Sequence, residues 1–346
     1  MEDNIKTGYV YDPVFLEHTQ SYHVENAARL EVIINELQTC ELFDILRAVP
    51  SRIATREELE YIHTANHIMN VQEISEMGGG HLDPDTYTTP SSFRAASVAA
   101  GSIIDLTLSV IDGTVKNGFS LLRPPGHHSL PGRAMGFCIF SNVALAAKAA
   151  LKQENINRVA IIDFDVHHGN GTQDVFYEDP DVLFISSHLF PFYPGTGSLA
   201  EIGEGNGKGK TINIPLGAGV GDNGFIQIYE EIVIPSLMDY KPDMIFVSAG
   251  YDSHWNDPLA NLGLTLSGLA WISQTLVETA DNICEGRIVF TLEGGYNLQV
   301  LASGVANSIK ALMGRNDFSD PIGKSSISEP DIAGLINNIQ QKLDLK

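Results

Sequence analysis

The sequence predicts one α/β domain with a mainly parallel sheet and helices on both faces. Short apolar segments rich in Val, Ile, Leu and Phe alternate along the 346-residue chain with longer segments of helical periodicity. Such alternation is typical of strands joined by right-handed helical crossovers. Most of the short segments are apolar at nearly every position rather than at every second one. That pattern is expected for strands that are buried on both faces.

The first half of the chain begins with helical patterns and continues with two strands. Residues 25–37 form an amphipathic helix, because their apolar side chains recur at helical spacing. Thr55 and Glu58 have the spacing of a capping box at the start of a short helix. Further helices are expected in the Ala-rich segments, and strands in the two β-branched runs. These helices are 93–108 and 142–151, and these strands are 118–122 and 158–164.

The second half continues the alternation and ends in a helix. Its predicted strands are 182–186, 211–214, 244–248 and 287–292, and its predicted helices are 225–238, 267–283 and 330–343. Ser328 and Asp331 have the spacing of a capping pair for the last helix. The polar segment 314–329 is interpreted as a connector to that helix, which should pack on the same domain. We therefore expect a single domain over residues 1–346, with its core at about 7–312.

Composition narrows the classes of partner and compartment. The chain has 21 Lys and Arg against 43 Asp and Glu, a net charge of −22. This charge argues against direct binding to nucleic acid or to anionic lipid, both of which attract basic surfaces. Three scattered cysteines fit a reducing compartment. Because the sequence suggests neither a secretory signal nor a membrane span, we expect a cytoplasmic protein. The sequence gives no basis for predicting an oligomeric state.

Polar residues follow four of the predicted strands at the edge where open parallel sheets bind ligands. His127 and His128 follow the strand 118–122 in the run RPPGHH. One histidine in such a loop is commonly a hydrogen-bonded loop residue, but an adjacent pair at a strand end favours acid–base chemistry near neutral pH.

The strand 158–164 leads into a set of charged residues on one face. Asp163, Asp165 and His167 are spaced at i, i+2 and i+4, so their side chains share a face of an extended chain. A buried strand does not carry such groups without a partner, and a cation would satisfy them. Asp252 follows the strand 244–248 and can complete a three-ligand set with an open position, which is typical of a catalytic metal. Tyr296, in the run EGGYN, is expected in the same region.

Seven segments of the chain have the character of family motifs. They are HVENAARL at 23–30, RPPGHH at 123–128, MGFCIFSN at 135–142, DFDVHHGNGT at 163–172, PGTG at 194–197, SAGYDSHWNDPL at 248–259 and EGGYN at 293–297. Together these segments resemble the histone deacetylase superfamily. Asn170, where the other classes usually have Asp, resembles the class II branch and its bacterial and acetylpolyamine-amidohydrolase relatives. The resemblance implies the arginase/deacetylase fold, with a central eight-stranded sheet.

The resemblance also implies roles for individual residues. Zinc, with Fe²⁺ as the alternative metal, would be held by Asp165, His167 and Asp252. The implied catalytic group is His127, His128, Tyr296, Asp163 and Asn170, with Asp163 beside His127 and Asn170 beside His128. The implied substrate channel is Phe137, Tyr193, Leu259, Gly136 and Gly294. A structural K⁺ is implied near Asp163, Asp165, His167, Ser186 and Ser187. Which histidine acts as the base is left open.

The predicted function is a zinc-dependent amidohydrolase that removes acyl groups from lysine in proteins or peptides. The alternative is a deacetylase of acetylpolyamines or other small acylated amines. Polyamine-specific relatives have Glu where this chain has Leu259, which cannot pair with a distal ammonium, so lysine substrates are favoured. An inactive binding protein is less consistent with an intact Tyr296. A two-manganese ureohydrolase would need more carboxylates than Asp257 supplies.

Overall fold

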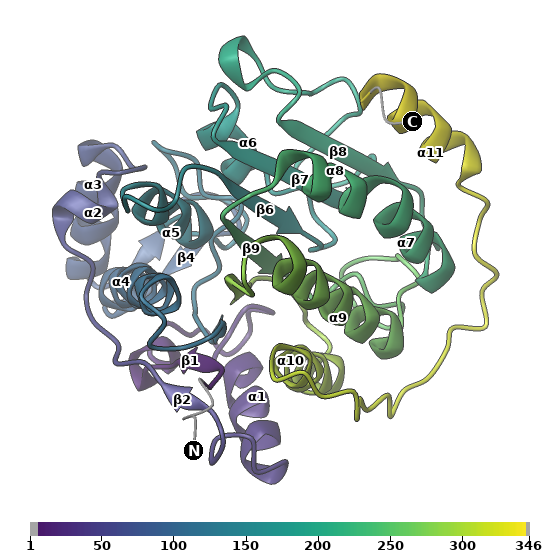
Figure 1. Ribbon diagram of the computed structural model, residues 1–346. Coiled ribbons are helices and arrows are strands. Elements are labelled where there is room, and N and C mark those ends of the chain that lie inside the picture. The colour runs from purple at the N-terminus through teal and green to yellow at the C-terminus, as the bar shows by residue number, and fades with distance from the viewer. Residues whose placement is uncertain (1–5, 344–346) are drawn as a thin grey trace.

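An eight-stranded sheet forms the centre of the computed structural model, which describes residues 6–343 (Figure 1). Every neighbouring pair in the sheet is parallel, and the strand order is β2-β1-β5-β10-β9-β6-β7-β8. The predicted fold class is therefore confirmed. Residues 1–5, included in the sequence-based exclusion of a secretory signal, and 344–346 lie outside the described residues. The strands are β1 (Gly8–Val10), β2 (Arg47–Ala48), β5 (Gly118–Ser120), β6 (Val159–Asp163), β7 (Val182–Leu189), β8 (Thr211–Leu216), β9 (Met244–Ala249) and β10 (Ile288–Leu292).

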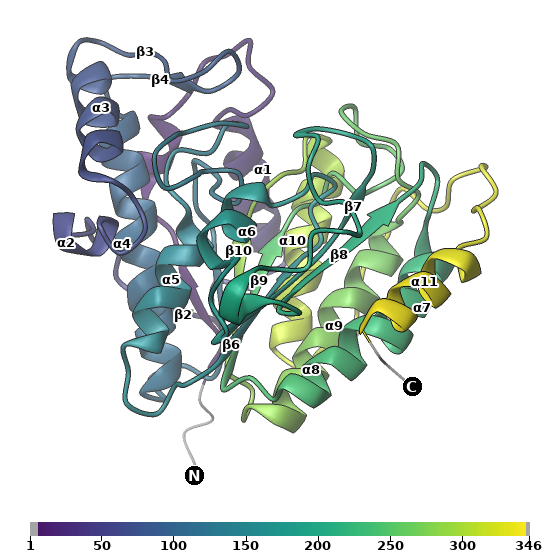
Figure 2. The same cartoon turned by 90° about the horizontal axis from the view of Figure 1, so that it is seen from above.

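Helices cover both faces of this sheet (Figure 2). One layer contains α4 (Ser92–Ile111), α5 (Asn142–Leu151) and α6 (Asn170–Phe176), with α2 (Arg56–Leu59) and α3 (Ala65–Glu76) near α4. The other layer contains α7 (Asp222–Ile228), α8 (Ile234–Tyr240), α9 (Leu266–Ile283) and α10 (Leu298–Leu312), with α1 (Ala28–Thr39) packed on α10. The remaining elements are η1 (Pro13–Leu16), η2 (Gly205–Gly207), η3 (Tyr229–Val233), α11 (Ala333–Leu343) and the small antiparallel pair β3 (Gly80–His81) and β4 (Tyr87–Thr88).

The predicted elements agree with the structure except at some ends. All six predicted strands are present, and Thr55 and Glu58 form the predicted capping box. The predicted helix 225–238 is longer and contains a π-helical segment at η3 between α7 and α8. The predicted start of the last helix at 330 is wrong, since α11 begins at Ala333. Asp331 accepts a hydrogen bond from the Ala333 amide, 2.9 Å away, in place of the predicted pairing with Ser328.

Helix α4 is long and apolar enough to cross a membrane by length and composition. In the structure 72% of its apolar window is buried inside the protein. It packs against α5 on one side and against β1, β5 and β10 on the other. Its composition is therefore that of a core helix under the sheet.

Strand order determines where the polar loops meet. The four strands followed by candidate site residues, β5, β10, β9 and β6, are consecutive neighbours in the sheet. Their ends are also level, because Ser248 in β9 lies opposite Asp163 in β6 and opposite Thr291 in β10. In a parallel sheet all carboxyl ends point to one edge, so the four loops converge there.

Candidate active site

A cavity of about 90 Å³ lies where these loops converge. It contains all five residues predicted for the substrate channel, together with both tandem histidines, His167 and Tyr296. Asp85 and Pro125 line it as well, and sequence reasoning gave neither a role. The lining residues are Asp85, Pro125, His127, His128, Gly136, Phe137, His167, Tyr193, Leu259, Gly294 and Tyr296.

Asp165, His167 and Asp252 form a buried group of metal-ligand type beside this cavity. One donor atom from each lies within 4.8 Å of the others. His167 Nδ1 is 3.1 Å from Asp165 Oδ1 and 3.4 Å from Asp252 Oδ2. Asp252 Oδ2 is buried and accepts no hydrogen bond from the described residues. Two buried carboxylates, one of which has an oxygen without a partner, and a neighbouring imidazole fit a divalent cation, because buried charges otherwise require partners.

Backbone amides hold the two carboxylates in place. The Gly294 amide donates to Asp165 Oδ2 at 2.7 Å, and the Val166 amide donates to Asp252 Oδ1 at 3.0 Å. These bonds orient the remaining oxygens, as partners of metal ligands generally do. Gly294 also has no room for a side chain, since a Cβ there would lie 2.0 Å from Asp252 Oδ2 and 2.5 Å from Asp165 Oδ2.

Gly294→Ala is therefore expected to lower metal affinity by about 100-fold, the upper range for disturbed supports of metal ligands. Metal content of the purified variant after dialysis, measured by mass spectrometry, checks this. Gly217→Ala is the matched control, because a Cβ at Gly217 would meet no atom within 4 Å. Equal metal content in the two variants would contradict the expectation.

The tandem histidines have partners of different charge. His127 Nδ1 lies 3.0 Å from Asp163 Oδ2, and His128 Nδ1 lies 2.7 Å from Asn170 Oδ1. Both contacts agree with the predicted pairing. Burial alone would lower the pKa of His127, but the carboxylates of Asp165, Asp163 and Glu293 raise it to about 10. Burial, together with the positive charges of its histidine neighbours, holds the pKa of His128 well below its ordinary value.

Tyr296 lies at the cavity, with its ring near one aromatic and one cationic side chain. Its ring centroid is 5.9 Å from that of Phe137, and the Arg29 guanidinium carbon is 5.0 Å from the ring centroid. Burial raises the pKa of Tyr296 well above its usual range. Tyr296 is therefore a protonated phenol at neutral pH and can donate a hydrogen bond.

Two aromatic side chains form the walls of the cavity. Phe137 has a left-handed backbone, with φ of 68°, and its amide donates to Thr86 Oγ1 at 3.1 Å. The Tyr193 ring stands perpendicular to that of His128, with the centroids 5.2 Å apart. Gly136 must be glycine, because φ is 56° and a Cβ would lie 2.4 Å from a ring carbon of His128. The two aromatic walls are therefore set close to the histidines, and Asp85 lines the same cavity.

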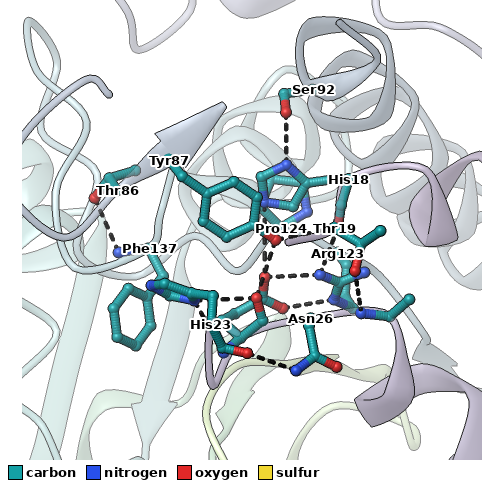
Figure 3. Close-up of polar contacts among 12 residues, drawn as sticks. His18, Thr19, His23, Asn26, Thr86, Tyr87, Ser92, Arg123, Pro124 and Phe137 are labelled. Atoms are coloured by element: carbon teal, nitrogen blue, oxygen red, sulfur yellow. Dashed lines mark hydrogen bonds and ion pairs between the residues drawn. The ribbon is translucent and has the colours of Figure 1, made fainter. Parts of the chain in front are cut away.

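A buried charged network supports these loops, and sequence reasoning gave it no role. Figure 3 labels one of its members, Arg123, among the polar contacts around it. Glu25, Arg29 and Arg123 are all fully buried. Arg123 binds Glu25 through two nitrogens, at 2.5 and 2.8 Å, and Arg29 binds Glu25 at 3.1 Å. Arg29 also donates to the carbonyls of Glu293, at 2.6 Å, and Gly295, at 2.8 Å. The network thus ties the RPPGHH turn to the EGGYN loop.

Glu293 supports the tandem histidines in a second way that the sequence did not reveal. Its Oε2 accepts the amides of Gly126 and His127, at 2.8 and 3.1 Å, and Ser248 donates to its Oε1 at 3.3 Å. The sequence does show that Glu293 directly follows an apolar strand, which indicates a buried carboxylate. Its backbone partners could not be read from sequence.

The residues predicted for K⁺ also lie together. Asp163 and Ser186 are opposite each other in β6 and β7, and Ser187 Oγ lies 3.4 Å from the Asp163 carbonyl oxygen. Asp163 is the last residue of β6, Ser186 and Ser187 belong to β7, and Asp165 and His167 follow β6 along the chain. A cation there remains a prediction.

Comparison with known proteins gives a consistent set of relatives. Residues 23–312 match the family described as "Histone deacetylase domain". The chain is 42% identical over 321 residues to "Histone deacetylase 14, chloroplastic" of Arabidopsis thaliana, covering 88% of this chain and 76% of that protein. It is 39% identical over 329 residues to a "Probable deacetylase" of Archaeoglobus fulgidus, covering 94% and 89%. The solved HD domain of HDA15 is similar with a TM-score of 0.90 at 34% identity, over 98% of this chain and 94% of that chain.

Proposed function

Because the chain belongs to the histone deacetylase family, we propose that it is a zinc-dependent amidohydrolase that removes acyl groups from the Nε of lysine. The observation that carries the proposal is the cavity beside Asp165, His167 and Asp252, lined by the tandem histidines and Tyr296. A donor set of this kind next to an acid–base pair and an oxyanion donor is suited to amide hydrolysis.

The metal ligands are proposed to be Asp165, His167 and Asp252. A Zn²⁺ ion bound there would polarise the amide carbonyl and lower the pKa of a water molecule. Oxygen-rich ligation is only weakly selective among divalent metals, so Fe²⁺ is the alternative. A structural K⁺ near Asp163, Ser186 and Ser187 is proposed as well.

The chain's own residues would move the protons. Asn170 Oδ1 can only accept, so His128 Nδ1 must donate to it, and this leaves His128 Nε2 with a free lone pair. His128 is therefore suited to take a proton from the attacking water. His127 faces the Asp163 carboxylate, which stabilises its protonated form, so it is suited to protonate the leaving amine.

Tyr296 would donate a hydrogen bond to the oxygen that gains negative charge as the carbonyl is attacked. The rings of Phe137 and Tyr193 would enclose the aliphatic stem of the substrate. Such walls suit a neutral acyl-lysine and disfavour a charged ammonium in the same place. Leu259, a half-buried residue that lines the cavity, is therefore proposed to contribute to substrate selection.

Lysine substrates are proposed over acetylpolyamines because Leu259 offers no negative charge to a distal ammonium. Turnover on a matched panel tests this proposal: an acetyl-lysine peptide, a trifluoroacetyl-lysine peptide and acetylspermidine, each with metal-loaded and metal-depleted protein. Metal-dependent release from the peptides, at a higher kcat/KM than from acetylspermidine, is expected. A higher value for acetylspermidine would favour the small-amine alternative.

Leu259→Glu is expected to raise the ratio of kcat/KM for acetylspermidine over that for the acetyl-lysine peptide by about 10-fold. A charge-assisted pair in a partly buried rim contributes about 1.5 kcal/mol, which corresponds to that factor. Both constants are measured for wild type and variant, with Leu259→Gln as the uncharged control. An unchanged ratio would show that residue 259 does not face the substrate.

The cytoplasmic location stays a prediction, since the Arabidopsis relative is named chloroplastic. The proposed partner is an acyl-lysine protein or peptide. The name "histone" belongs to the relatives and does not identify the substrate of this chain.

A further inference from the structure

Asp257 lies in the loop after β9 and binds two other parts of the site through backbone amides. Its side chain is buried, with 7% of its surface exposed. Its Oδ2 accepts the Tyr296 amide at 2.8 Å and the Asn297 amide at 3.2 Å. Its Oδ1 accepts the Leu259 amide at 2.9 Å. One carboxylate thus accepts backbone amides from Tyr296 and from Leu259, two residues that line the cavity.

A second contact joins the same two loops. Asn297 Nδ2 donates to the Asn256 carbonyl at 2.9 Å, and Asn297 Oδ1 caps α10 by accepting the amides of Gln299 and Val300. The Asp257 carboxylate therefore lies at the N-terminus of the 15-residue helix α10. Burial and the nearby charge of Asp252 raise the pKa of Asp257 to about 7, and the amides of Leu259, Tyr296 and Asn297 oppose this rise.

We propose that Asp257 is a positioning residue that holds Tyr296 in place for the reaction. The inference rests on the proposed function, because it takes Tyr296 as the oxyanion donor. Asp257 accepts the backbone amide of Tyr296 itself, so this bond acts on Tyr296 directly, whereas Arg29 holds the loop through the carbonyls of Glu293 and Gly295. Displacement of a reacting group by about 1 Å can cost 100-fold in rate. A carboxylate that served α10 alone would not affect the reaction beyond its effect on stability.

A double-mutant cycle with Tyr296 separates these two roles. Asp257→Ala is expected to lower kcat by about 10- to 100-fold, with KM and metal content within about threefold of wild type. In a Tyr296→Phe background, Asp257→Ala is expected to change kcat by less than about threefold, because the group that it positions is already absent.

Asp257→Asn is the second variant, to be used if Asp257→Ala does not fold. Asparagine has one acceptor oxygen in place of two, so either Leu259 or the Tyr296 and Asn297 pair loses its acceptor. Its loss of kcat should lie between wild type and alanine and should also disappear in the Tyr296→Phe background.

Glu329→Gln is the matched control, since Glu329 is another carboxylate at a helix N-terminus. It accepts the amides of Gly221, Asn223 and Gly224 at the start of α7. This variant is expected to lower the melting temperature without changing kcat.

The outcomes separate the inference from the proposed function. If the double variant lost kcat by the product of the two single losses, Asp257 would not act through Tyr296, and the positioning role would be overturned while the proposed function stayed intact. An unchanged kcat in Asp257→Ala would overturn the positioning role as well. If Tyr296→Phe alone leaves kcat unchanged, the oxyanion role and this inference both fail.

Discussion

Asp252→Ala is expected to lose most of the bound metal and all measurable deacetylation while the fold is retained. Asp252 is one of the three proposed ligand side chains, and its Oδ2 is buried without a hydrogen-bond partner among the described residues. Asp165 and His167 alone would then have to hold the metal, and His167 would lose one of its two carboxylate neighbours. The loop backbone stays supported by the core of β9, so circular dichroism should be unchanged. Elemental analysis of dialysed protein measures the metal.

Asp239→Ala is the control, because Asp239 is an exposed carboxylate on α8. It should retain both metal and activity. Full metal occupancy in Asp252→Ala would mean that the ion is held elsewhere.

Tyr296→Phe is expected to lower kcat by about 100- to 1,000-fold, the usual effect of removing one oxyanion donor. The ring stays between Phe137 and Arg29, so packing and the substrate channel should be preserved. KM should stay within about threefold, because the phenol acts mainly in the transition state. Steady-state kinetics on an acetyl-lysine peptide measures both constants.

Tyr22→Phe removes a phenol that is 80% exposed and should leave both constants unchanged. If Tyr296→Phe instead raises KM and keeps kcat within threefold, Tyr296 would be a binding residue only.

The strands were predictable because burial on both faces leaves a strong apolar pattern. All six predicted strands belong to the middle and one edge of the sheet. β1 and β2 were missed because they contain three and two residues, too few to show a pattern. Helix α6 begins at Asn170, inside the polar run after β6, where no apolar periodicity marks a helix. Only the resemblance to a known family supplied the count of eight strands.

The site was predictable in its residue types and less so in its supports. A buried strand is expected to carry apolar residues, so Asp165 and His167 directly after an apolar run stand out in the sequence. Arg29, Glu293 and Asp257 act through backbone atoms of distant loops, so no spacing in the sequence reveals their partners. The contact from Arg29 to Gly295 joins residues 266 positions apart. Such pairs are defined only by the completed sheet.

That separation has a consequence for synthesis of the protein on the ribosome. Arg29 is translated long before the carbonyl groups that it binds, which lie 264 and 266 residues later in the chain. At a translation rate of about 5–20 residues per second, these partners are synthesised roughly 13 to 53 s after Arg29. During this interval β10 is absent, so β5 and β9 have no strand between them. On the proposed mechanism, the nascent chain cannot hydrolyse an amide before residues 293–297 have been translated. Capture of the proposed metal should follow the same step, because the Gly294 amide orients the Asp165 carboxylate.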